Sequence, residues 1–146
     1  MKWKYWLPVL VMMIFIFGFS SLPEQKVAQL SDPGIKQLNY LVYQVDPVAP
    51  KIEWLDFGHA IGYLFLASAF LYALTHTMAL RHPFWFAWFF SFCYSLTDEF
   101  HQSFVPGQSS EWKDILIDTL AAGVALVFIA IMLRHRARKA EINRRS

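Results

Sequence analysis

The chain has 146 residues, of which 56% are hydrophobic, 18% are aromatic and only 16% are charged. Because soluble domains carry about 25% charged residues, this composition predicts a single membrane domain over residues 1–146. The net charge of +2 is small and unevenly distributed, which argues against nucleic acid as a partner. The single cysteine, Cys93, excludes an internal disulfide and a cysteine-based metal cluster.

Four apolar segments predict an all-α, four-helix bundle that spans the membrane. The first covers residues 6–22 and is close to the shortest length that crosses a hydrocarbon core of ~30 Å. Its basic start and small residues also fit a cleavable signal peptide, but its length favours a span. The other three cover residues 55–74, 84–100 and 115–133, and a basic tail follows at 134–146.

A polar segment with four prolines separates the first two spans. Inside it, apolar residues recur at helical spacing from Ile35 to Val45, which predicts a short amphipathic helix on the outer membrane surface. Ordinary packing of this helix over the ends of the spans explains the pattern equally well.

Basic residues predict the orientation of the bundle. With four spans, both termini share a side with the short turn between the second and third spans, and that side holds nine of the thirteen Lys and Arg residues. Cytoplasmic segments carry the excess of basic residues, so both termini are expected in the cytoplasm. The basic tail is therefore interpreted mainly as a topology signal.

Polar side chains gather at the outer ends of three predicted spans, at positions that share helix faces. Ionisable groups at this depth are costly and usually mark function. Asp98 and Glu99 are candidate catalytic groups, with His59 as a proton carrier. The candidate ligand-binding residues are Asp56, Tyr63, Gln102, Gln108, Asp114 and Asp118.

Two residues of this region need separate mention. Asp118 lies about one turn inside the fourth span, so we expect a partner for it across the bundle, either His59 or Gln102. His101 points away from Asp98 on a helical wheel and is left outside the site. The segment lacks the paired histidines of a zinc motif, so no metal or cofactor is assigned, although carboxylates with one histidine are compatible with a hard cation.

The same residues resemble the VanZ-like family of small bacterial membrane proteins. The resemblance rests on the segment from Asp98 to Gly107, which reads Asp-Glu-Phe-His-Gln-Ser-Phe-Val-Pro-Gly, and on the acids that follow at 114 and 118. Residues 56–63 and 19–23 also resemble the family's second-span motif and the end of its first span. The resemblance implies a four-span cell-envelope protein, and the family's founding member is associated with low-level resistance to the glycopeptide teicoplanin.

The chain departs from the family pattern in its fourth span, where Ala121 and only Gly123 stand in place of a Gly-rich segment, and at three single positions. Gln108 stands where the family usually has Arg, Phe57 where it usually has Lys, and Asp118 where it often has Asn. An Arg at 108 would hold a phosphate or carboxylate through two hydrogen bonds, which Gln cannot do. The resemblance therefore implies altered ligand choice or reduced activity in this chain.

Three functions are compatible with these patterns. The first is binding of a lipid-linked cell-wall precursor or a lipophilic glycopeptide antibiotic at the outer leaflet, with membrane lipids as neighbours. The second is a membrane-embedded enzyme that uses Asp98, Glu99 and His59 on a lipid or precursor headgroup. The third is a structural role in which the polar residues only hold helices together. Because no Ser or Cys stands beside a base in a recognisable motif, we favour binding.

Overall fold

The computed structural model describes residues 2–22, 37, 40, 41, 43–45, 54–108 and 110–145, and for residues 54–57 it describes the backbone alone. Every regular element in these ranges is a helix, as the sequence predicts. The elements are η1 (Trp3–Trp6), α1 (Leu7–Ser20), α4 (Trp54–Thr77), α5 (Pro83–Gln102) and α6 (Trp112–Arg145). The segment predicted to form the amphipathic surface helix lies largely outside the described residues.

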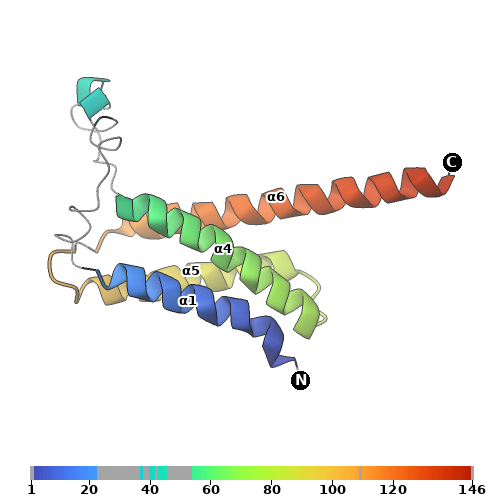
Figure 1. Ribbon diagram of the computed structural model, residues 1–146, viewed down its shortest axis with the longest axis horizontal. Coiled ribbons are helices and arrows are strands. Elements are labelled where there is room, and N and C mark those ends of the chain that lie inside the picture. The colour runs from blue at the N-terminus through green and yellow to red at the C-terminus, as the bar shows by residue number, and fades with distance from the viewer. Residues whose placement is uncertain are drawn as a thin grey trace.

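The four long helices form an up-and-down bundle in which α4 packs against α1, α5 and α6 (Figure 1). One end of the bundle holds the last turn of α1, the first turn of α4, the last turn of α5 and the first turn of α6. We call this the polar end. The opposite end, here called the terminal end, holds the N-terminus and the turn between α4 and α5, and α6 leaves the bundle there (Figure 1).

Within the described part of the chain, three helices are long and apolar enough to cross a membrane: Trp3–Ser20, Gly58–Thr77 and Trp112–Arg145. The fourth helix, α5, lies between its neighbours in the same bundle, but its last turns carry Asp98, Glu99 and Gln102. The outward face of α6 is apolar and exposed at Leu120 and Val124, which suits contact with lipid. Four spans and the orientation of the termini stay predictions.

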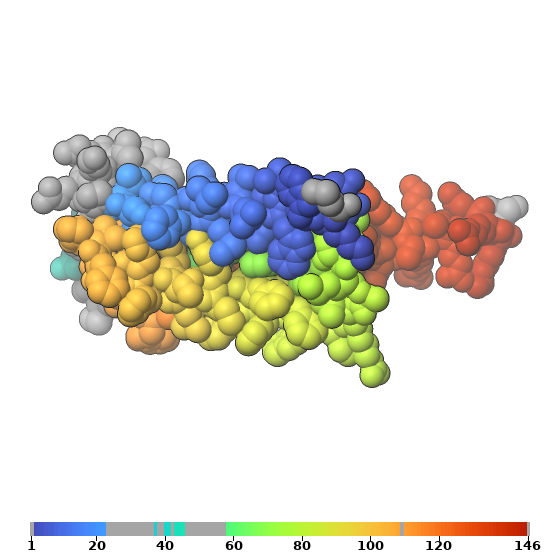
Figure 2. Space-filling view, turned by 90° about the horizontal axis from the view of Figure 1, so that it is seen from below, coloured from blue at the N-terminus to red at the C-terminus, as the bar shows by residue number. Residues whose placement is uncertain are grey.

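The last helix differs from the prediction of a span that ends at residue 133. α6 continues without a break to Arg145, so the basic tail is a helical extension that projects beyond the bundle (Figures 1 and 2). The physical reason is local, because the tail contains neither Gly nor Pro and is rich in Ala, Arg, Lys and Glu, which favour helices. An ion pair between Glu141 and Arg145, four residues apart, supports the last turn.

Two glycines let α1 approach α4 closely near the polar end. A Cβ atom at Gly58 would lie 2.5 Å from the Phe19 ring, and one at Gly62 would lie 3.0 Å from Ile16 Cγ1. Gly58 and Gly62 are four residues apart on one helix face, which is the small-residue spacing that allows membrane helices to pack backbone to backbone. This contact places the end of α1 directly beside His59.

Candidate functional site

Four side chains from three helices meet at the polar end, and we call them the polar cluster: Ser20 of α1, His59 of α4, and Asp98 and Gln102 of α5. The Ser20 hydroxyl lies 2.9 Å from His59 Nε2 and donates a hydrogen bond to Asp98 Oδ2 at 2.9 Å. Asp98 Oδ2 is 3.7 Å from His59 Nε2, and Gln102 Nε2 is 3.3 Å from the same ring nitrogen. All four side chains are buried. The expected convergence of α4 and α5 is therefore present, and α1 contributes to it.

Ser20 is the centre of the cluster, and its single hydrogen limits what it can do. The Ile16 carbonyl accepts from the hydroxyl at 2.8 Å, and the Asp98 carboxylate lies 2.9 Å from the same oxygen. Because a hydroxyl carries one hydrogen, these two acceptors compete for it, and the Ser20 oxygen is left to accept from His59 Nε2–H. The Gln102 amide, in contrast, can donate only to an unprotonated His59 Nε2, so the contacts of Ser20 and Gln102 with this nitrogen favour opposite tautomers of the ring.

The cluster brings a serine beside a histidine, but its geometry differs from that of a serine-hydrolase triad. In a triad the carboxylate binds the histidine nitrogen opposite to the one that faces the serine. Here Asp98 and Ser20 both approach Nε2 of His59. Ser20 has no exposed surface, so a substrate carbonyl has no direct path to its oxygen. The arrangement suits hydrogen-bonding recognition better than nucleophilic attack.

A second layer of polar groups lies one turn deeper, between α4, α5 and α6. Ser95 Oγ donates to Asp118 Oδ2 at 3.2 Å, and both residues are buried. Ser95 is thus the partner of Asp118, which corrects the expectation of His59 or Gln102. Ser95 lies one helical turn before Asp98, at the depth where Asp118 of α6 faces α5. The Ser95 hydroxyl is therefore the polar group that contacts the Asp118 carboxylate.

Several buried oxygens in these two layers lack hydrogen-bond partners among the described residues. They include Tyr63 OH, Asp98 Oδ1 and Asp118 Oδ1. Tyr63 is completely buried and lies within electrostatic range of both carboxylates. Buried polar atoms are nearly always hydrogen-bonded, so this group can accept additional donors or donate to an additional acceptor. The Tyr63 hydroxyl lies near both Asp98 and Ser95, so part of this capacity is used inside the bundle.

Glu99 faces away from the polar cluster, toward the start of α6. Its carboxylate accepts a hydrogen bond from the Glu111 backbone N–H, the residue just before Trp112. A carboxylate at this place satisfies an N-terminal N–H and complements the positive end of the α6 dipole. Asp114 lies in the first turn of the same helix. Glu99 and Asp114 therefore belong to the α6 entry, beside the polar cluster and not in it.

Two further residues connect the end of α1 to the segment after α5. Gln108 Nε2 donates to the Leu22 carbonyl at 2.6 Å. His101 Nε2 lies 3.1 Å from Ser21 Oγ, and its ring stacks on Phe17 with 4.3 Å between ring centroids. His101 therefore packs on α1 outside the polar cluster.

The remaining predicted site residue is Asp56, which lies in the first turn of α4 with its side chain outside the described part of the structure. Reasoning from the sequence missed Ser20. The available signal was its place at the end of the first span, in the Phe19–Pro23 segment that carries part of the family resemblance. Its partners lie 39 and 78 residues away in the chain, so no local pattern could reveal them.

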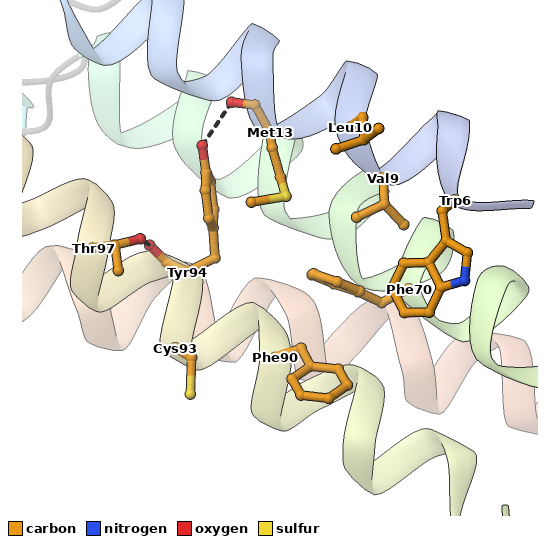
Figure 3. A pocket seen from close by; sticks show the side chains of 9 residues that line it. All are labelled: Trp6, Val9, Leu10, Met13, Phe70, Phe90, Cys93, Tyr94 and Thr97. Carbon is orange, nitrogen blue, oxygen red and sulfur yellow. Dashed lines mark hydrogen bonds between the residues drawn. The ribbon is translucent and has the colours of Figure 1, made fainter. Parts of the chain in front are cut away.

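An apolar groove, here called the lateral groove, opens between α1 and α5 (Figure 3). Its volume is about 480 Å³, and Phe70 of α4 lines it between the two helices. Tyr94 crosses it and donates to the Met13 carbonyl at 2.6 Å. Thr97, at the polar end of the groove, is the chain neighbour of Asp98. The other lining residues are Trp6, Val9, Leu10, Phe90 and Cys93.

The donor set in this region is rich in hydroxyls and amides. Among the residues that the structure describes, no group of three or more His, Cys, Asp or Glu is arranged to hold a metal ion.

Comparison with known proteins points to one family. The model of the VanZ/LLP1 family matches residues 5–133, which include all four long helices up to the extension of α6. No curated protein and no solved structure matches the chain. Since the matched region covers most of the chain, this membrane-type helical protein belongs to the VanZ/LLP1 family.

Proposed function

We propose that this protein is a four-span protein of the bacterial plasma membrane, with both termini in the cytoplasm, that binds a lipid-linked cell-wall precursor in the outer leaflet. The precursor's lipid chain lies in the lateral groove, and its headgroup is held by hydrogen bonds at the polar end. A lipophilic glycopeptide antibiotic has the same two parts, an apolar chain and a hydrogen-bonding head, and would compete for the same place.

The observation that carries this proposal is the position of the lateral groove relative to the polar cluster. Thr97 lines the groove and Asp98 belongs to the cluster, so an apolar chain and a polar head on one ligand can be bound together. A headgroup would be bound by half-buried polar side chains at the polar end, such as Gln108, because the oxygens of Tyr63, Asp98 and Asp118 lie inside the bundle. Ligand sites commonly combine apolar walls with a few fixed polar groups in this way.

One observation favours the alternative of a membrane enzyme, namely the 2.9 Å contact between Ser20 Oγ and His59 Nε2. The burial of Ser20 and the position of Asp98 on the same side of the ring weigh against it. An isosteric Asp98→Asn variant separates the two functions, because binding would persist whereas acid–base turnover would fall by ~10²-fold or more.

Binding is tested by titrating the purified full-length protein with a lipid-linked cell-wall precursor and, separately, with teicoplanin, and by measuring retained ligand by native mass spectrometry. Leu10→Trp fills the lateral groove with a residue that is already 55% exposed, so the fold should tolerate it. We expect about a tenfold or greater loss of precursor affinity, equivalent to about 1.4 kcal/mol of lost apolar contact.

Val11→Trp is the matched control, because Val11 is also 55% exposed on α1 but does not line the groove. It should leave affinity unchanged. Equal losses in both variants would contradict the assignment of the lateral groove, and absence of precursor binding to the unmodified protein would contradict the function. Retention of teicoplanin without the precursor would identify the antibiotic as the ligand, and release of a cleaved headgroup would replace binding by catalysis.

A further inference from the structure

A second apolar groove opens on the other side of α5, toward the terminal end of the bundle. It lies between α5 and α6 and has a volume of about 480 Å³. Five of its lining residues are apolar, and the sixth, Arg134, is the first basic residue of the α6 extension. The lining residues are Phe84, Leu126, Val127, Ala130, Leu133 and Arg134.

This groove adjoins a third one that continues along α5 and α6 toward the polar end. Both are lined by Val127, and the third groove, of about 500 Å³, reaches Gly123 and Thr119. At its far end Trp88 Nε1 donates to the Thr119 carbonyl at 3.2 Å. From Thr119 to Arg134 the α6 axis rises about 22 Å. One leaflet of a hydrocarbon core of ~30 Å is about 15 Å deep, so the two grooves can hold a lipid chain of one leaflet.

Arg134 gives the open end of this path a positive charge that the described residues leave uncompensated. Its side chain is exposed and forms no ion pair within the described ranges. Arg81 lies in the turn that precedes Phe84, and Arg136 and Arg138 follow on α6, so the terminal end is strongly basic. An Arg fork is suited to a phosphate, with which it forms two parallel hydrogen bonds.

We propose that the two adjoining grooves between α5 and α6 together bind one anionic glycerophospholipid, which belongs to the leaflet on the side of the chain termini. An acyl chain lies along the groove from Leu133 to Gly123, and the Arg134 guanidinium binds the lipid phosphate. The site is separate from the one proposed for the cell-wall precursor, since it shares no lining residue with the lateral groove and lies on a different face of α5.

Charge favours a lipid over a second copy of this chain as the occupant. A two-fold contact between copies through this groove would pair identical surfaces, and each copy would bring its own Arg134 and Arg138 to the contact. Within its described residues the α6 extension has one acidic side chain, Glu141, and this side chain already pairs with Arg145. The extension therefore offers little charge to offset the arginines of a second copy. An anionic lipid removes this repulsion and fills the apolar part of the groove at the same time.

The experiment measures binding of phosphatidylglycerol and of phosphatidylcholine to the full-length protein by native mass spectrometry after purification in detergent. We expect one phosphatidylglycerol to be retained preferentially. Arg134→Gln should weaken its retention about tenfold, the size expected for a charge-assisted hydrogen bond. Arg136→Gln is the control, because it removes the same charge two residues away on another face of α6, and it should weaken retention clearly less than Arg134→Gln, since it removes no phosphate contact.

A second pair of variants tests the apolar part without altering charge. Ala130→Trp should block the groove and lower retention about tenfold or more. Met132→Trp, at a position that lines neither groove, should leave it unchanged. The proposal is overturned if the two lipids bind equally, if Arg136→Gln weakens binding as much as Arg134→Gln, or if Ala130→Trp abolishes a dimer without affecting the lipid preference.

Discussion

Removing the Ser20 hydroxyl should cost more than its size suggests, because three helices meet at this one oxygen. Ser20→Ala deletes the contacts with His59 Nε2 and Asp98 Oδ2, which join α1 to α4 and α5. The Ile16 carbonyl loses only an extra donor, since it still lies within the backbone ladder of α1. After the change, His59 and Asp98 stay buried, and each has lost its contact with Ser20.

The magnitude follows from measured hydrogen bonds between membrane helices, which are worth about 0.6 kcal/mol on average and up to about 1.7 kcal/mol. Two such contacts give a range of about 1.2 to 3.4 kcal/mol. Because Ser20 is completely buried and Asp98 is charged when ionised, we expect a value near the middle, about 2 kcal/mol. This corresponds to about a thirtyfold change in the folding equilibrium.

The assay is reversible unfolding of the purified protein in mixed detergent micelles, followed by tryptophan fluorescence. A double-mutant cycle with Asp98→Ala should give a coupling energy of about 0.6 to 1.7 kcal/mol. Ser21→Ala is the control, since its exposed hydroxyl contacts Phe17 and His101, and it should cost less than about 0.5 kcal/mol. If Ser20→Ala costs no more than Ser21→Ala, or if the cycle is additive, the reasoning about the polar cluster is refuted.

Two other substitutions test how α1 is positioned and what Gln108 does. Gly62→Val should lower the free energy of unfolding by about 1 to 3 kcal/mol in the same assay, because the new side chain meets Ile16 at the α1–α4 contact. Gly18→Val should be close to neutral, because a Cβ atom there meets no described atom within 4 Å. Equal costs would contradict the close approach of α1 to α4. Gln108→Arg should keep the hydrogen bond to Leu22 and raise affinity for an anionic precursor headgroup about tenfold, measured by ligand retention, and an unchanged affinity would show that residue 108 does not face the headgroup.

The residues that reasoning from sequence placed correctly share one property, which is that their positions follow from a single helix. His59, Asp98 and Gln102 lie at the same end of the bundle because antiparallel helices of similar length return their ends to common depths.

Errors arose where a residue had several possible neighbours on other helices. The sequence predicts His59 or Gln102 as the hydrogen-bond partner of Asp118, because all three residues lie near the polar end. The rotation of α6 about its axis instead brings the Asp118 carboxylate to Ser95. Glu99 and Asp98 are adjacent in sequence but project about 100° apart around α5, so one enters the polar cluster and the other binds the α6 entry. Helix rotation is set by side-chain packing, which sequence periodicity alone does not supply.

By itself the sequence determined the helical class, the membrane-type apolar segments and the family, since run length, helical period and motif spacing are local properties of the chain. Only the tertiary structure decided that Ser20 unites the polar cluster, that the lateral groove opens between α1 and α5, and that Arg134 lines a second groove on another side of α5. These features depend on how three or four helices pack and rotate against one another, and contacts across 39 and 78 residues form only when the bundle closes.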